Sequence, residues 1–238
     1  MLYFIGIGLN DEKDISFKGL EAIKKCKYVY LENYTSKLNC SVKDLEKFYK
    51  KKIILADREF VENKNIEILN KAKKENVAFL VIGDVFSATT HITLFIDAKK
   101  LKIKTKIIHN ASILNAIGEV GLELYKFGKT TSIPFNNENV KTPIEVFKKN
   151  YENEMHTLFL LDINEKLMMI NEGLSYLMKN GIDNDVIGIA GLTNDKQEIK
   201  YGKIKDLMKI KFKLFPQCII IPGKKLHFVE EEALELWK

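Results

Sequence analysis

Short apolar runs rich in β-branched and aromatic residues alternate along this chain with longer amphipathic segments. Runs such as VAFLVI (residues 77–82) are apolar at every position, as in strands that are buried on both faces of a sheet. The segments between them, such as residues 65–75, carry apolar residues at helical spacing. This alternation predicts a parallel sheet covered by helices over residues 2–112.

The first half of the chain has a regular order of expected elements. Strands are expected at 2–9, 28–33, 52–58, 76–84 and 105–112. Helices are expected at 16–26, 41–49, 65–75 and 89–101. Ser41 is the expected N-cap of the second helix.

After residue 112 the pattern changes, which indicates a second α/β domain. Strands are expected at 130–135, 155–163, 185–192 and 216–223, and a short strand and helix within 198–210. Helices are expected at 113–124, 142–154, 165–181 and 228–237. Thr142 is the expected N-cap before Pro143, and Gly181 the residue that ends its helix. The domains are therefore expected at 1–110 and 111–238.

Composition and charge disfavour several classes of protein. The net charge of +6 is mild, and the lysines are spread over many segments. A nucleic-acid-binding protein more often concentrates them beside aromatic residues, so we expect no direct contact with nucleic acid. No apolar stretch approaches the roughly 20 residues of a membrane-spanning helix. The N-terminus lacks the basic start and the small-residue cleavage site of a signal peptide.

Cysteine and histidine spacing argues against a metal site. Cys26, Cys40 and Cys218 have no metal-ligand spacing, and a small odd number of cysteines is typical of the reducing cytosol. The four histidines lie far apart, without HxxxH or HExxH. We therefore expect no metal, a cytoplasmic location, and core packing for Cys26 and Cys218.

The segment GDVFSATTH (residues 83–91) is the most polar junction between a strand and a helix. Ligands of open α/β sheets bind outside the carboxyl ends of the strands, where Asp84 can accept from a ligand hydroxyl or balance a cation. A plainer interpretation is an Asx-turn at Asp84, with Thr89 or Thr90 capping the next helix. His91 is more typical of a packing residue than of a catalytic one.

Three further junctions carry candidate ligand contacts. GIGLN (6–10) places two glycines after the first strand, which fits either close approach of a ligand or a tight turn. HNASIL (109–114) offers Ser112 and Ile113, with Ser112 as a helix N-cap the equal alternative. LLDINEK (160–166) sets Asp162 after another apolar strand, where a helix dipole alone would favour an acidic side chain.

Motifs of several enzyme classes are missing from the sequence. GIGLN does not continue as GxGxxG, because residue 11 is aspartate, and no GxxxxGK[ST] P-loop occurs. The GxSxG elbow of serine hydrolases is absent as well. Dinucleotide oxidoreductases, P-loop NTPases and serine or cysteine hydrolases are therefore disfavoured.

The junction motifs also carry a family likeness. YLENYTS (30–36), DREFVE (57–62) and GDVFSATTH are similar to motifs of the diphthine synthase family, which are S-adenosylmethionine-dependent methyltransferases of the tetrapyrrole-methylase fold class. HNASILNAIGEVGLELYKFGKTTSIPF (109–135) matches the family pattern HNASIxNAxGxxGLxxYxFGxTxxIPF almost throughout. The likeness runs in order along nearly the whole chain.

This resemblance implies a fold, a reaction and partners. It implies two α/β domains of the tetrapyrrole-methylase type with the cofactor cleft between them, and a homodimer. The reaction would move methyl groups from S-adenosyl-L-methionine, leaving S-adenosyl-L-homocysteine, to the modified histidine of translation elongation factor 2 during diphthamide biosynthesis. The acceptor would be an amine on that side chain, and no catalytic residue is assigned.

Carried over by position, the resemblance implies cofactor contacts at strand ends in both halves of the chain. These residues are Leu9, Asp84, Ser87, Ser112, Ile113, Ile163, Leu192 and Gln217. Val85 departs from the family pattern, because it replaces the proline after the aspartate and leaves the turn less rigid. Gly191 stands where the family usually has an arginine after the alanine, so this chain lacks a family residue beside the contact expected at Leu192.

Two other functions remain open from the sequence. One is a methyltransferase of the same fold that acts on a tetrapyrrole or another small molecule. The other is a nucleotide-binding or RNA-associated module without catalysis. The HNASI and ATTH segments favour the protein-modifying enzyme, because a tetrapyrrole methylase is expected to lack them. A non-catalytic module would bind cofactor without transferring methyl groups.

Overall fold

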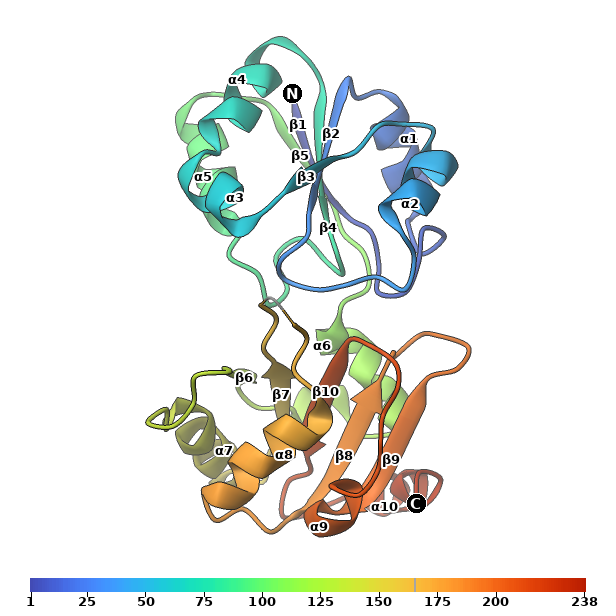
Figure 1. Ribbon diagram of the computed structural model, residues 1–238, viewed down its shortest axis with the longest axis vertical. Helices are drawn as coiled ribbons and strands as arrows, with labels where there is room; N and C mark the ends of the chain where they lie inside the picture. The colour runs from blue at the N-terminus through green and yellow to red at the C-terminus, as the bar shows by residue number, and fades with distance from the viewer. Residues whose placement is uncertain (165) are drawn as a thin grey trace. The chain divides into compact units, whose positions relative to one another are not determined.

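A computed structural model describes residues 1–164 and 166–238 of the chain, which form two compact units, Met1–Asn115 and Ala116–Lys238. Each unit contains its own five-stranded sheet with helices packed against it (Figure 1). The predicted α/β class is therefore confirmed. None of the described helices is long and apolar enough to cross a membrane.

The sheet of the first unit is parallel, as the alternation of strands and helices predicts. Its strands are β1 (Leu2–Gly6), β2 (Tyr28–Glu32), β3 (Ile54–Ala56), β4 (Val77–Val81) and β5 (Thr105–Ile108). They lie in the order β3-β2-β4-β1-β5, and every neighbouring pair is parallel. All five carboxyl ends therefore face one edge of the sheet, and the loops that follow the strands gather there.

Helices cover both faces of this first sheet. They are α1 (Phe17–Lys24), α2 (Val42–Tyr49), α3 (Arg58–Asn63), α4 (Ile66–Lys74) and α5 (Ile92–Lys100). In Figure 1, α1 and α2 lie on one side of the strands, and α3, α4 and α5 on the other. Successive side chains of β1 alternate between two apolar clusters, with Tyr3 and Ile5 on the α1–α2 side and Leu2 and Phe4 on the other.

The second unit has a mixed sheet. Its strands are β6 (Thr131–Ile133), β7 (Thr157–Leu161), β8 (Asp185–Ala190), β9 (Glu198–Lys203) and β10 (Gln217–Ile221). The order is β6-β7-β10-β8-β9, in which β6 and β7 are parallel and the other neighbours antiparallel. The longer helices are α7 (Thr142–Glu152), α8 (Ile170–Lys179) and α10 (Phe228–Glu235), with the short α9 (Ile204–Leu207) after β9. Side chains of α7, α8 and α9 share one core with the strands.

Two of the predicted helix ends are confirmed, and a third is wrong. Ser41 caps α2, because its hydroxyl accepts from the Asp44 N–H at 3.2 Å while the Asp44 carboxylate accepts from the Ser41 N–H. Gly181 follows the α8 C-cap with a φ of +81°. Thr142 is not an N-cap, since α7 already includes it and Lys141 takes that position.

Other expected elements were wrong in their extent. The expected helix at 113–124 is instead a short turn α6 (Ile113–Ala116) and two 3₁₀ turns, η1 (Ile117–Val120) and η2 (Leu124–Lys126). Gly121 ends η1 at a φ of +91°, which no continuous helix allows. Helix α3 was missed, because the expected strand at 52–58 ends early and Asp57 caps a helix there.

The expected helix at 165–181 begins later, at Ile170. Its first expected residue, 165, lies outside the described residues. Before α8, Ile163 instead forms an antiparallel bridge with Leu167, and the Met168 N–H donates to the Asp162 carbonyl. These four residues therefore belong to no helix.

A buried carboxylate joins three segments of the second unit. Glu230 on α10 is 1 % exposed and accepts from the N–H groups of Glu123 and His227, from Lys126 Nζ and from His156 Nε2. Burial alone would raise the pKa of Glu230, but these donors outweigh it and lower the pKa to about 2. His156 accepts from the Gly223 N–H through Nδ1, so its proton is on Nε2, and burial lowers its pKa.

Replacing Glu230 by glutamine should therefore destabilise the second unit by about 3 kcal/mol, because an amide cannot satisfy four donors or balance Lys126. The folded-state pKa is lower than the unfolded value, so the carboxylate stabilises the fold above pH ~4.5 and loses that effect as the pH falls towards 2. Urea unfolding between pH 7 and pH 3 measures both effects.

The matched control is Glu231→Gln, which changes an exposed carboxylate on the same helix. It should alter the free energy of unfolding by less than about 0.5 kcal/mol. Equal effects of the two substitutions would contradict the role given to the buried carboxylate.

Candidate functional site

The loops that follow β1, β4 and β5 meet at the carboxyl edge of the first sheet. Gly8 and Gly83 form an antiparallel bridge, with N···O distances of 3.3 and 2.7 Å. A Cβ placed on Gly83 would lie 3.7 Å from Leu9 Cδ2 and 3.8 Å from the Cα of Ser112. The structure therefore brings together three of the loops that the sequence singled out.

Asp84 is the centre of this junction. Its Oδ1 accepts from the Phe86 N–H at 3.3 Å and from the Ser87 hydroxyl at 3.2 Å. Its Oδ2 accepts from His109 Nδ1 at 2.8 Å and from the Asn110 N–H at 3.1 Å. The carboxylate thus joins the loop after β4 to the loop after β5, with its side chain 10 % exposed.

Asp84 stays ionised in this position. Burial alone would raise its pKa, but the N–H of Asn110 and the imidazole of His109 outweigh burial and hold the pKa below the usual value. An ionised carboxylate only accepts hydrogen bonds, so His109 carries its proton on Nδ1. The result is a fixed negative charge at the edge where ligands of parallel sheets bind.

The helix-cap interpretation of GDVFSATTH holds in one part and fails in another. Asp84 makes the expected Asx-turn to the Phe86 N–H. Neither threonine caps α5, whose N-cap residue is His91. Ala88 reverses the chain at a φ of +58°, and Thr89 donates to the Val85 carbonyl at 2.8 Å instead. Part of the polar character of this loop therefore serves the turn itself.

Leu9 and Ser112 are each fixed by bonds within their own loops. Asp14 Oδ2 accepts from the N–H groups of Leu9 and Asn10, at 3.0 and 2.7 Å. The Ser112 hydroxyl accepts from the Leu114 N–H at 3.2 Å, and the Ser112 N–H donates to Asn115 at 2.7 Å. Ser112 thus caps the turn that contains Ile113, as its plainer interpretation expects.

Sequence reasoning missed Asn110, although it lies inside the HNASIL segment. Its amide nitrogen donates to the carbonyls of Gly6 and Asp14, at 3.1 and 3.0 Å. It therefore ties the loop after β5 to the loop after β1. The sequence signal was an asparagine at a strand end, between a histidine and small residues. Its role could not be predicted from that signal, because its partners are about 100 residues away in the chain.

The three predicted residues of the second unit lie at one edge of the second sheet. Ile163 follows β7, Leu192 follows β8, and Gln217 begins β10, which is antiparallel to both. Gln217 is 6 % exposed, and it accepts from the Ile170 N–H at 2.8 Å and donates to the Leu214 carbonyl at 2.9 Å. Its amide therefore holds the start of α8 at this edge.

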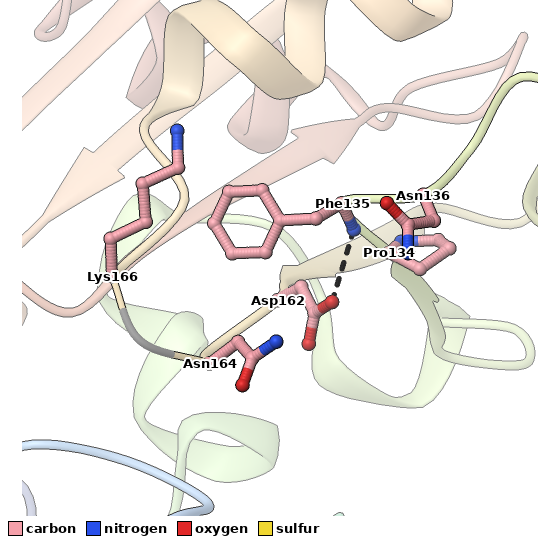
Figure 2. Close-up of a pocket in the computed structure, with 6 residues that line it drawn as sticks. All are labelled: Pro134, Phe135, Asn136, Asp162, Asn164 and Lys166. Carbon is pink, nitrogen blue, oxygen red and sulfur yellow. Dashed lines mark hydrogen bonds between the residues drawn. The ribbon is translucent and has the colours of Figure 1, made fainter.

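A pocket of about 390 Å³ opens at the same edge, beside Ile163. Its lining consists of Pro134, Phe135, Asn136, Asp162, Asn164 and Lys166. Asp162 does not begin a helix, and its Oδ2 accepts from the Phe135 N–H at 3.0 Å (Figure 2). Lys166 Nζ lies 4.8 Å from the centroid of the Phe135 ring and pairs with Glu172 at 2.7 Å. The pocket thus offers an aromatic ring and amide and carboxylate oxygens.

The two departures from the family pattern have structural consequences. Val85 is fully buried in the core on the α3–α5 side of the first sheet. Apolar packing therefore fixes this turn where the family uses a proline. Gly191 has a φ of +63°, and a Cβ there would lie 2.7 Å from Leu214 Cβ. An arginine at position 191 would not fit this backbone and its neighbour.

Among the described residues, no group of three or more histidine, cysteine, aspartate or glutamate side chains could hold a metal ion. Cys26 and Cys218 are buried, and burial raises the pKa of Cys26 to about 11 and of Cys218 to about 12. Both thiols are therefore protonated core residues, as expected from the sequence.

The glycine bridge gives a stability prediction. Gly8→Ala should lower the free energy of unfolding by about 1–2 kcal/mol, because alanine is strained at a φ of +84°. Overpacking should lower it by about 1–3 kcal/mol more, because the new Cβ would lie 2.3 Å from Asp14 Cβ. Gly83→Ala should cost only the first part, since its φ is +81° but its Cβ would make ordinary contacts. Urea unfolding of both variants measures the difference, and equal losses would contradict the close packing of Asp14 on Gly8.

Comparison with known proteins agrees with this arrangement. The family model for Tetrapyrrole (Corrin/Porphyrin) Methylases matches residues 1–208. A diphthine synthase from Methanocaldococcus jannaschii is 44 % identical over 99 % of the chain and 98 % of that protein. A diphthine methyl ester synthase from Dictyostelium discoideum is 42 % identical over 100 % of the chain and 98 % of that protein. A crystal structure of diphthine synthase superposes with a TM-score of 0.95 at 36 % identity, covering 99 % of this chain and 95 % of that one. These relatives align with nearly the whole chain at 36–44 % identity. The chain is therefore a methyltransferase that belongs to the diphthine synthase family of the tetrapyrrole methylases.

Proposed function

We propose that this protein is an S-adenosylmethionine-dependent methyltransferase that methylates the modified histidine of translation elongation factor 2 during diphthamide biosynthesis. The observation that carries the proposal is full-length identity of 42–44 % to proteins named diphthine synthase and diphthine methyl ester synthase. The polar loops at the carboxyl edge of the first sheet support it, because such an edge is where parallel sheets hold cofactors.

The proposed cofactor contacts come from the strand-end loops of both units. They are Leu9, Asp84, Ser87, Ser112 and Ile113 of the first unit, and Ile163, Leu192 and Gln217 of the second. Backbone groups carry much of this role, since the side chains of Asp84, Ser112 and Gln217 already have hydrogen-bond partners within the protein.

The residues present fit a sulfonium cofactor. S-adenosylmethionine combines a cationic sulfur with an amine, a carboxylate and an aromatic base. The ionised Asp84 supplies a fixed negative charge that offsets the cation. Glycines at positions 8 and 83 leave the backbone without side chains beside Leu9 and Ser112. Because Asp84 is held by four neighbours, its charge needs little reorganisation when the cofactor binds.

When bound, S-adenosylmethionine supplies a methyl group: the acceptor's lone pair forms the new bond to carbon, the carbon–sulfur bond breaks, and its electron pair stays on sulfur. Such an in-line displacement demands chiefly positioning. The strand-end loops supply that positioning through the bonds of Asp84, Asn110 and Asp14. We propose that the proton of an acceptor amine leaves to solvent or to a nearby carboxylate.

We further propose that the enzyme acts in the cytoplasm as a homodimer. The location follows from the proposed substrate, which is a translation factor. The dimer follows from the resemblance to the diphthine synthase family. Light scattering of the purified protein measures the second point directly.

The function is tested by transfer of labelled methyl groups. The purified protein should label elongation factor 2 that carries the unmethylated intermediate, and should not label the same factor with an unmodified histidine. Absence of label on the modified factor would overturn the proposed function. Label on a tetrapyrrole alone would favour the small-molecule methylase.

The cofactor site is tested by Asp84→Ala, which removes the fixed charge and releases the two loops. We expect the Kd for S-adenosylmethionine to rise at least ~10-fold, the scale of a charge-assisted contact. Isothermal titration measures it, with Asp206→Ala as a control that removes an exposed aspartate far along the chain. An unchanged Kd for Asp84→Ala would remove Asp84 from the cofactor site.

A further inference from the structure

The chain contains one arginine, Arg58, among 38 lysines and arginines. It begins α3, two residues after β3, at the same carboxyl edge of the first sheet as the proposed cofactor residues. Lysine serves the other cationic positions of this chain, whereas arginine differs from lysine in its planar, five-donor fork. The contacts of Arg58 therefore indicate what kind of group this arginine could bind.

Arg58 lies over the ring of Tyr34, with Cζ 5.5 Å from the ring centroid. Among the described residues, none accepts a hydrogen bond from its guanidinium or forms an ion pair with it. The carboxylates of this segment have other partners: Asp57 caps α3 through the Phe60 N–H at 2.8 Å, and Glu59 pairs with Lys64 at 2.7 Å. Glu62, one turn along α3, accepts from the Thr90 hydroxyl at 3.5 Å. The guanidinium therefore lies over the Tyr34 ring, and its N–H groups can donate to a ligand.

Tyr34 is held in place by a carboxylate with no solvent exposure. Glu32, at the end of β2, accepts from the N–H groups of Tyr34, Thr35 and Ile82 and from the Thr35 hydroxyl. Ile82 follows β4, so Glu32 fixes the loop after β2 against the end of the neighbouring strand. Phe60 of α3 stacks on Tyr30 of β2, with ring centroids 5.7 Å apart, and this fixes the helix that carries Arg58.

His91 completes the cluster from a third loop. It is 1 % exposed, it meets the Tyr34 ring edge-on at 5.8 Å, and its Nδ1 lies 3.5 Å from the Tyr34 hydroxyl. Burial lowers the pKa of His91 to about 4, so the ring is neutral at physiological pH. A neutral histidine leaves Arg58 as the cation of this cluster and adds no charge that would compete with it.

We propose that Arg58, which lies over the Tyr34 ring, binds a carboxylate of the methyl acceptor and so positions the acceptor for transfer. This proposal rests on the proposed function. The name diphthine methyl ester synthase says that such a relative makes a methyl ester, and an ester oxygen comes from a carboxylate, so the acceptor of that relative carries one. A planar guanidinium with free N–H edges is the side chain best matched to a carboxylate.

The sheet order gives the acceptor and the cofactor separate places on one edge. In the first unit, the proposed cofactor loops follow β4, β1 and β5, whereas Tyr34 and Arg58 follow β2 and β3 at the other end of the order β3-β2-β4-β1-β5. The loop after β4 belongs to both groups, because it carries Asp84 at its start and His91 at its end. Arg58 is therefore a positioning residue for the acceptor.

The experiment compares Arg58→Ala, Arg58→Lys and Lys99→Ala in steady-state methyl transfer to modified elongation factor 2 at saturating S-adenosylmethionine. Lys99→Ala is the matched control, since Lys99 is also an exposed cation over an aromatic ring, 5.2 Å from the centroid of Phe95. We expect Arg58→Ala to raise KM for the acceptor roughly 10- to 100-fold, with an unchanged Kd for S-adenosylmethionine. Arg58→Lys should recover only part of the loss, and Lys99→Ala should behave as the unaltered enzyme.

A second acceptor identifies the group that Arg58 contacts. When the carboxylate of the modified histidine has been amidated, Arg58→Ala and the unaltered enzyme should have nearly equal KM values. Equal fold-losses with both acceptors, or an unchanged KM with the natural acceptor, would overturn the inference while leaving the proposed function intact. No transfer by the unaltered enzyme would overturn the proposed function and this inference with it.

Discussion

The carboxylate of Asp84 is the contact on which the candidate site depends. Phe86 and Ser87 donate to it from its own loop. His109 and Asn110 donate from the loop after β5, which lies nearby because β4 and β5 both neighbour β1 in the sheet. Asn110 extends the connection to the loop after β1. The three loops therefore form one hydrogen-bonded network, and a change in any of them disturbs the positions of the others.

In the first unit, two buried carboxylates organise strand-end loops in the same way. Glu32 after β2 is fully buried and organises the Tyr34 loop, much as Asp84 organises the loops after β4 and β5. Both carboxylates accept from backbone N–H groups that strand ends leave without sheet partners. A parallel sheet leaves many such groups along its carboxyl edge. Carboxylates that accept from them tie the loops of that edge to one another.

Sequence reasoning was most successful where local chemistry decides the outcome. The strand-like apolar runs, the Ser41 cap and the Asx-turn at Asp84 each depend on a few adjacent residues. It failed where distant partners decide. Thr89 and Thr90 have good capping side chains, but the turn at Ala88 directs Thr89 to Val85 and α5 begins later. The apolar run before Arg58 led to a predicted strand at 52–58, so the N-cap at Asp57 and the helix that carries Arg58 were missed.

We propose that strand-end loops in each unit bind S-adenosylmethionine. Hydrogen–deuterium exchange with and without S-adenosylhomocysteine tests it most directly, because exchange reports on each backbone amide separately. We predict slower exchange in residues 6–14, 83–91 and 109–115, and in 161–168, 190–193 and 214–217. Helix α10 (Phe228–Glu235) should be unchanged. Protection confined to other segments, or to α10, would contradict the account.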